Sequence, residues 1–164
     1  MKSLNDYIDQ YRKQVEKGDI QEAYKGLMGY MMNLRNHFQK KYPEYLVSGS
    51  IYFGFMDMTY FSFTPKTLKD KGLKIAIVFI HDEIKFEVWL AGANKQIQLK
   101  YWKIFKESHR TPYSIPADTK CVDFIITHNL VDHPDFNDLD NLTKLIEKGT
   151  HKFTKDILPF LSER

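Results

Sequence analysis

Two neighbouring apolar segments in the middle of the chain constrain its fold more than any other feature. Residues 73–80 are apolar almost throughout, whereas residues 84–90 place an apolar side chain at every second position. A continuous apolar run is typical of a strand covered on both faces, and a period of two is typical of a strand with one open face. The link at residues 81–83 is short enough for a tight antiparallel turn. The sequence therefore predicts a β-hairpin at the centre of a sheet.

Apolar side chains recur at helical spacing in four other segments, which cover residues 4–15, 20–38, 97–105 and 139–157. This spacing predicts amphipathic helices that each bury one side. Asp19 and Glu22 have the spacing of a capping box at the start of the second helix, and Asn94 is a typical N-cap residue for the third. Pro159 is expected to truncate the last turn of the fourth helix.

Three more segments have the composition of strands, at residues 46–53, 58–64 and 121–130. With the hairpin and the helices they give the order ααββββαβα. Because most consecutive strands are joined by short links, we expect a mainly antiparallel sheet of about five strands with helices packed on one face. No stretch has the composition of an interdomain linker, so residues 1–164 are predicted to form a single α+β domain.

The charged residues argue against some classes of partner. The formal net charge is +3, and the basic residues are 20 lysines and only four arginines. Arginine is the preferred residue for contacts with phosphates and base edges, so its scarcity argues against a nucleic-acid surface.

The longest apolar run is too short to span a membrane, and the first residues lack the apolar stretch of a signal peptide. We therefore expect a cytoplasmic protein without a membrane partner. Its one cysteine, Cys121, lies in a strand-like segment, and we expect it to be buried.

The candidate site is the open face of the predicted sheet. Lys85, Glu87 and Trp89 share one side of their strand, and Tyr60 lies in a neighbouring strand. Aromatic rings supply contact area, while a lysine and a glutamate can orient polar groups of a ligand. These four residues predict a non-enzymatic binding domain for a small molecule or a protein partner. We expect replacement of Trp89 by alanine to abolish binding and to leave folding largely intact.

Two other functions stay open. Asp57, followed by Glu83 and Lys85, is similar to the acid and Glu-x-Lys pattern of the PD-(D/E)XK nucleases, which implies a metal-dependent phosphodiester hydrolase. Glu83 departs from that pattern because it falls in the predicted turn. A homodimer formed through the apolar face of the second helix or through the sheet edge is the other alternative. We assign no cofactor, no metal and no catalytic residue.

One further segment could bind an anion. Residues 92–95 open a helix directly after a strand, and the helix N-terminus there offers free N–H groups next to Lys95. Plain capping by Asn94 explains the same residues, and the segment has no nucleotide-binding pattern.

Three segments, at residues 47–65, 74–81 and 86–92, together resemble a family of bacterial proteins of unknown function and similar length. The resemblance covers most of the chain and implies a self-standing cytoplasmic domain. It implies no activity and no catalytic residues.

Overall fold

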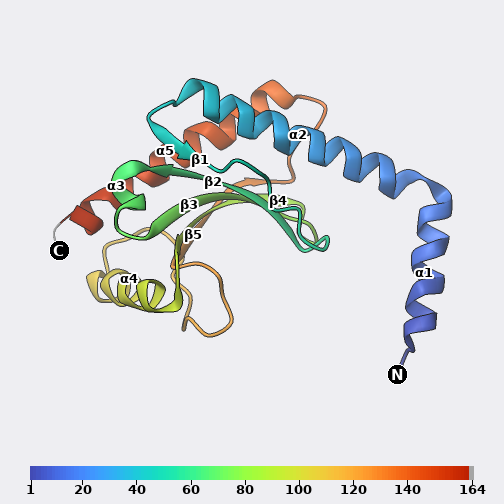
Figure 1. Cartoon of the computed structure of the whole chain (residues 1–164), viewed down its shortest axis with the longest axis horizontal. Coiled ribbons are helices and arrows are strands. Elements are labelled where there is room, and N and C mark those ends of the chain that lie inside the picture. The colour runs from blue at the N-terminus through green and yellow to red at the C-terminus, as the bar shows by residue number, and fades with distance from the viewer. Residues whose placement is uncertain (163–164) are drawn as a thin grey trace.

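A five-stranded antiparallel sheet forms the centre of the protein. The computed structural model describes residues 1–162. The strands are β1 (Tyr45–Val47), β2 (Met58–Pro65), β3 (Leu73–Ile80), β4 (Lys85–Gly92) and β5 (Ile126–Asp132). They lie side by side in sequence order, β1-β2-β3-β4-β5, and each pair is antiparallel (Figure 1). The predicted α+β class and the order ααββββαβα are therefore confirmed.

The predicted hairpin is the middle of this sheet. β3 and β4 pair along their whole length, from Leu73 opposite Gly92 to Ile80 opposite Lys85. β3 is buried on both faces except at Lys74 and Ile80. A central strand with two covered faces explains the nearly continuous apolar run in the sequence.

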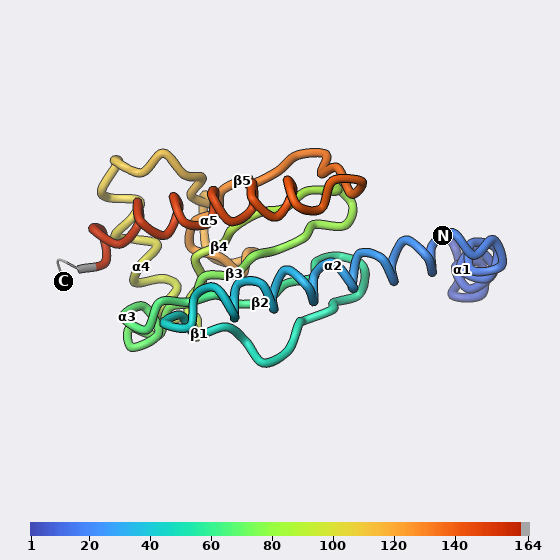
Figure 2. The backbone as a smooth tube through the Cα atoms, turned by 90° about the horizontal axis from the view of Figure 1, so that it is seen from above, coloured from blue at the N-terminus to red at the C-terminus, as the bar shows by residue number. Residues whose placement is uncertain are grey.

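The described helices are α1 (Leu4–Lys17), α2 (Asp19–Lys41), α3 (Lys66–Lys69), α4 (Lys95–Ser108) and α5 (Leu139–Ser162). α2 and α5 cover one face of the sheet (Figures 1 and 2). Phe38 of α2 and Ile146 of α5 are fully buried there against sheet residues such as Phe61 and Phe86. Within residues 1–162, no helix combines the length and the apolar character that a membrane span requires.

α4 lies at the end of the sheet where β3 begins and β4 ends, below the strands in Figure 1. Its buried residues Tyr101 and Phe105 join Phe153 and Ile157 of α5 in a second apolar cluster. Asn94 caps this helix as predicted, because its side chain accepts a hydrogen bond of 3.0 Å from the backbone N–H of Ile97.

Two helix ends differ from the prediction. α2 has Gly18 as its N-cap with no side-chain cap, so the predicted capping box at Asp19 is wrong. Gly18 adopts the left-handed conformation (φ 83°) and ends α1 as well as starting α2, which leaves no separate capping position. Pro159 lies inside α5, which continues to Ser162. A proline so close to a C-terminal end disturbs only the last turn, so the helix does not stop there.

Two strands are shorter than predicted. β1 covers only residues 45–47, and the chain meets β2 again at a single bridge between Tyr52 and Tyr60. β5 starts at Ile126, and residues 121–125 run as irregular chain beside β4. Cys121 is consequently exposed, not buried as expected. A strand-like composition predicts an apolar segment beside the sheet, but it does not show where the chain leaves the ladder.

Candidate functional site

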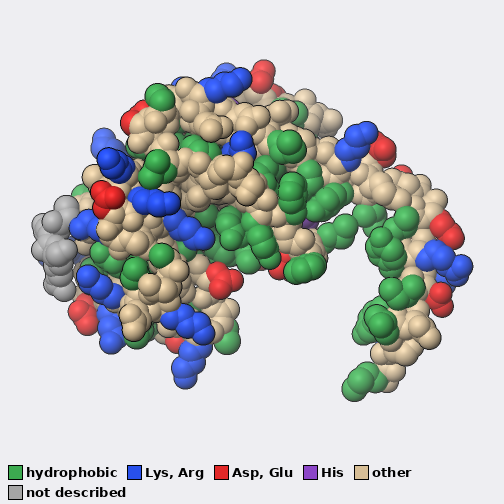
Figure 3. Space-filling model, viewed as in Figure 1, with side chains coloured by type: hydrophobic (Ala, Val, Ile, Leu, Met, Phe, Trp, Pro, Cys, Tyr) green, Lys and Arg blue, Asp and Glu red, His purple; other side chains and the backbone are tan. Residues whose placement is uncertain are grey.

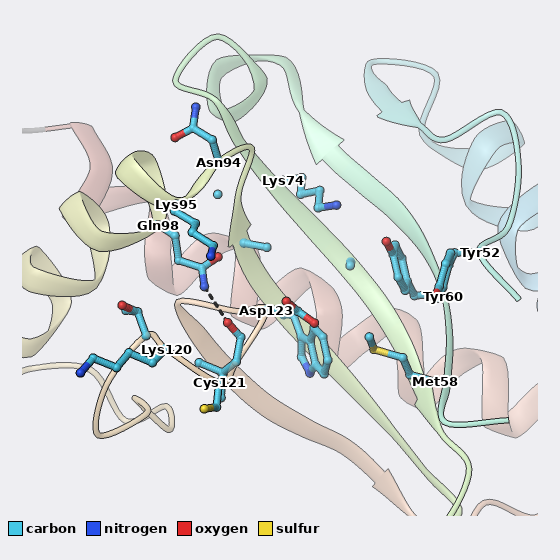
Figure 4. A pocket seen from close by; sticks show the side chains of 16 residues that line it. Tyr52, Met58, Tyr60, Lys74, Asn94, Lys95, Gln98, Lys120, Cys121 and Asp123 are labelled. Atoms are coloured by element: carbon cyan, nitrogen blue, oxygen red, sulfur yellow. Dashed lines mark hydrogen bonds between the residues drawn. The ribbon is translucent and has the colours of Figure 1, made fainter. Parts of the chain in front are cut away.

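A cavity of about 670 Å³ lies on the sheet face opposite α2 and α5 (Figure 4). Its floor consists of side chains from β2, β3 and β4, including Tyr60, Lys74 and Trp89. The start of α4 closes one end, and the irregular segment 119–123 forms the remaining wall. The cavity therefore collects residues from parts of the chain that are far apart in the sequence.

Aromatic rings contribute to the cavity at two places, beside β2 and on β4. The ring centroids of Tyr52 and Tyr60 lie 4.9 Å apart with an interplanar angle of 30°, and Figure 4 shows the two rings side by side. The ring centroids of Trp89 and Phe124 also lie 4.9 Å apart, and Phe124 directly follows the irregular segment. Trp89 is only 8% exposed and belongs to a small apolar cluster with Ala76 and Val78. Core packing therefore holds Trp89 in place, whereas Tyr52 is 42% exposed.

Hydrogen bonds fix the orientation of Trp89. Its indole Nε1 donates to Oε2 of Glu87 at 2.7 Å, and the hydroxyl of Thr127 donates to the same oxygen at 3.3 Å. The Nζ atom of Lys85 lies 2.8 Å from the other carboxylate oxygen of Glu87 and 2.8 Å from Glu83. Hydrogen bonds to Glu83 and Glu87 raise the pKa of Lys85 despite its partial burial, so the ammonium stays charged. This network positions the tryptophan beside the cavity.

The structure separates the four predicted site residues into two pairs. Tyr60 and Trp89 line the cavity, whereas Lys85 and Glu87 lie outside its lining and pair with each other. Trp89 is also more buried than an open sheet face implies, because residues 121–125 cover part of that face. We therefore revise the expectation for the alanine variant of Trp89, which should lose stability as well as any binding.

Three lysines at the cavity were not among the predicted ligand-binding residues. Lys74, Lys95 and Lys120 all line it, with Asp123 as the one acidic residue of the lining. Among residues 1–162, no carboxylate lies within 4 Å of these lysine ammonium groups. The lining residues thus carry three positive charges and one negative charge, and Figure 4 shows the Lys120 side chain directed away from the other lining residues. The sequence indicated two of these lysines. Lys74 is a single charged residue in an apolar strand, and Lys95 belongs to segment 92–95, which could bind an anion.

Tyr60 can contribute both its aromatic ring and its protonated hydroxyl group to the cavity. Burial raises the pKa of its hydroxyl, and the nearby Tyr52 and Asp123 raise it further. The Nζ atom of Lys74 lies 5.4 Å from the centroid of the Tyr60 ring, within the range of a cation–π contact. The hydroxyl of Tyr60 is therefore a hydrogen-bond donor at neutral pH beside the Lys74 ammonium.

One hydrogen bond joins two of the walls. The side-chain amide of Gln98 in α4 donates to the carbonyl oxygen of Val122 at 2.9 Å, as the dashed line in Figure 4 shows. This bond ties the irregular segment to the helix that closes the end of the cavity. The thiol-bearing Cys121 lies in the same segment and is exposed.

The residues of the hydrolase alternative have other partners. Asp57 accepts a hydrogen bond from the backbone N–H of Phe55 at 2.9 Å, and this bond, with another from Met58, lowers the pKa of Asp57. Glu83 forms its ion pair with Lys85. Among the described residues, no group of three or more His, Cys, Asp or Glu side chains is placed to hold a metal ion. Asp57 and Glu83 are therefore each engaged in local contacts.

Comparison with known proteins identifies one family. A family model described as "Domain of unknown function (DUF7000)" matches residues 4–161. Neither the curated proteins nor the solved structures contain a significant match to the chain. The resemblance inferred from the sequence is confirmed at the level of a family of unknown function. Because the match extends over almost all of the chain, the protein belongs to the DUF7000 family.

Proposed function

We propose that the protein is a non-enzymatic binding domain that takes a small, planar, anionic molecule in the cavity on the sheet face. The observation that supports this proposal is the convergence, within the described residues, of lysines without ion pairs and aromatic walls in one hollow. A volume of about 670 Å³ is within the range of small-molecule sites. We expect the protein to act in the cytoplasm, where its exposed cysteine stays reduced.

The chemistry of the lining defines the ligand class. The face of Tyr52 or Tyr60 offers a surface on which a flat ring can stack. Lys74 and Lys95 reach the same hollow from the sheet and from the start of α4, so a carboxylate or phosphate on the ring can pair with either. The Lys74 ammonium has no carboxylate within 4 Å among the described residues, so an anionic ligand can supply its ionic partner.

A small molecule fits this surface better than a protein partner. Stable protein interfaces bury about 800 Å² on each side and have few charges at their centre. Here charged residues such as Lys74 line a hollow together with aromatic rings. A ligand that enters the hollow meets both groups, whereas a flat protein surface meets only the rim.

The test uses three probes that separate ring from charge. Phenyl phosphate carries both features, inorganic phosphate carries only the charge, and phenol carries the ring without the charge. We expect calorimetric titration to show the tightest binding for phenyl phosphate. Lys74→Met should weaken that binding about tenfold, which corresponds to roughly 1.4 kcal/mol. Methionine keeps much of the length and apolar stem of the side chain, so the change removes mainly charge.

Lys69→Met is the matched control, since Lys69 is exposed on α3 and lies outside the cavity. It should bind phenyl phosphate as the unmodified protein does. The proposal is contradicted if phenyl phosphate and inorganic phosphate bind equally well, or if both lysine variants behave alike. Absence of binding by every probe, together with a bare mass in native mass spectrometry of gently purified protein, also overturns it.

A further inference from the structure

The first helix carries an apolar face that nothing in the described chain covers. Leu4, Tyr7, Ile8 and Tyr11 are between 54% and 74% exposed, and no residue of α1 is buried. Figure 3 shows hydrophobic side chains along the side of α1 that is turned toward the rest of the molecule. An isolated helix of 14 residues is marginal in water, so this one needs a packing partner to stay folded.

A long apolar groove lies next to this helix. Its volume is about 1020 Å³, and one wall is the N-terminal half of α2, from Ile20 to Asn33. The opposite wall includes Met56 and Ile84 from two turns and Phe136 from the segment before α5. These three side chains are 39% to 52% exposed although they are large and apolar. The groove therefore presents unburied surface of the same kind as α1.

The helix cannot cover the groove of its own chain. A single residue, Gly18, separates α1 from α2, and Figure 1 shows α1 turned away from the axis of α2 at that point. Two helices that fold back against each other need a connection of about two to five residues. With one residue between them, α1 is unable to lie along the N-terminal half of α2.

We propose that α1 of a second copy of this chain occupies the groove, and that two copies exchange their first helices around a two-fold axis. The lengths agree, because α1 and the α2 wall from Ile20 to Asn33 are each about 21 Å long. The groove begins beside Gly18, so a two-fold axis near that residue lets α1 of each copy, called the arm below, reach the groove of the other copy.

The exchange also has the size and character of a stable interface. The two contacts bury on the order of 2,000 Å² in total if each arm covers its groove along the full length, which is the range of homodimers. The groove lining contains one acid and one lysine, Glu22 and Lys25, among mainly apolar and aromatic residues. An isologous contact between an apolar helix face and an apolar groove satisfies both surfaces of each chain at once.

The test places opposite charges on the two partners of the contact. Ile8→Lys alters the arm, and Ala23→Glu alters an exposed position in the groove, so neither change disturbs the core. Sedimentation of the full chain should show a dimer, at twice 19.5 kDa, that each variant weakens at least about tenfold. An equimolar mixture of the two variants should form a mixed dimer. In that dimer one arm and one groove remain unaltered, and in the other contact the introduced ammonium meets the introduced carboxylate.

Two controls keep these outcomes specific. Gln10→Lys puts the same charge on the other side of α1, and Gln39→Glu puts the same charge on the far end of α2. Both should remain dimeric, and circular dichroism should show all four variants folded, apart from helix lost from α1 where the dimer dissociates. A monomer of the unmodified chain across micromolar concentrations overturns the proposal. So does a dimer that Ile8→Lys disrupts and Ala23→Glu does not, since that result means arm-to-arm pairing.

Discussion

The two hollows of this protein differ in what builds their walls. The floor of the cavity on the sheet face contains core residues, such as Trp89 at 8% and Ala76 at 3% exposure, and its rim is formed by exposed polar residues of α4 and of segment 119–123. The groove beside α2 is lined by residues that the fold leaves open, such as Met56 at 52% and Ile84 at 46%. The first hollow has a polar rim over a packed floor, whereas the second leaves large apolar side chains uncovered.

Charge separates the two surfaces in the same way. Three lysines without ion pairs to any described residue lie at the cavity, whereas the groove has one acid and one lysine in a mainly apolar lining. Unpaired charge inside a hollow favours a small ligand of opposite sign, and uncovered apolar surface favours another apolar element. The composition of the lining, more than its volume, therefore separates the kind of molecule that each hollow favours.

The largest expected effect contrasts an aromatic residue of the cavity with one of α1, the helix that we propose for the groove of a second copy. Trp89→Ala removes a buried ring from the cavity wall and should lower the free energy of unfolding by about 3–5 kcal/mol. Tyr7→Ala removes a ring that is 58% exposed on α1 and should change the stability of the monomer by less than about 0.5 kcal/mol. Urea denaturation of dilute protein measures both values. Equal losses would show that α1 is packed as firmly as the sheet.

Acid should destabilise the half of α2 that is far from the groove. Burial by itself raises the pKa of Glu147, but hydrogen bonds from Lys41, Tyr42 and His37 outweigh it and lower this pKa to about 2. The carboxylate therefore stabilises the fold above its unfolded pKa of about 4.5, and this contribution is lost as the pH falls toward 2. We expect a loss of about 3 kcal/mol between pH 5 and pH 2.

Glu147→Gln provides the contrast for this acid effect. The variant should be less stable at pH 7 and should lose less on acidification, because its side chain does not titrate. Hydrogen exchange should show the loss of protection in the C-terminal half of α2, where Lys41 and Tyr42 meet Glu147. An unchanged pH profile in Glu147→Gln would assign the acid sensitivity to another carboxylate.

Gly18→Ala tests how the arm is set. Gly18 has φ 83°, and no atom lies within 4 Å of an added Cβ, so the cost is conformational. A non-glycine residue in this conformation costs about 1–2 kcal/mol. We expect faster hydrogen exchange in α1 and a weaker dimer, with no change in ligand binding at the cavity. Gly49→Ala is the control, since Gly49 has open space and no positive φ.

The smallest expected effect is a difference in salt response. Raising the salt concentration from about 0.1 M to 1 M shortens the screening length from about 10 Å to 3 Å. Binding of phenyl phosphate at the lysines should weaken severalfold, while association through the apolar groove should stay constant or strengthen. Titration and sedimentation at both concentrations measure the two responses. A dimer that dissociates in salt would argue for an electrostatic interface instead.

Local patterns in the sequence predicted most of the fold. Alternation over residues 84–90 placed Lys85, Glu87 and Trp89 on one face, and the structure has them on the face opposite α2 and α5. Helical periodicity identified α1 as amphipathic, and Asn94 marked the start of α4. These predictions succeed because the spacing of apolar residues records which side of an element is covered.

The candidate site was only partly predictable. Tyr60 and Trp89 were recognised through strand patterns, but Lys95 and Lys120 reach the cavity from a helix start and an irregular loop. No local pattern links these segments, because their meeting depends on the path of the chain between α4 and β5. Lys85 and Glu87 were misjudged for a different reason, because their partners are neighbours in the sequence: Lys85 pairs with Glu83 and Glu87, and Glu87 also accepts a hydrogen bond from Trp89.

The sequence by itself determined the strands, the helices and the sides on which they bury apolar surface. The tertiary structure alone decided that Lys74 and Trp89 share a hollow with the start of α4, and that α1 is left without cover beside an open groove. The physical reason is the range of the interactions. Periodicity shows which side of a helix or strand is buried, but it does not show which residues that side contacts. A site needs particular side chains from distant segments within a few ångströms of one another.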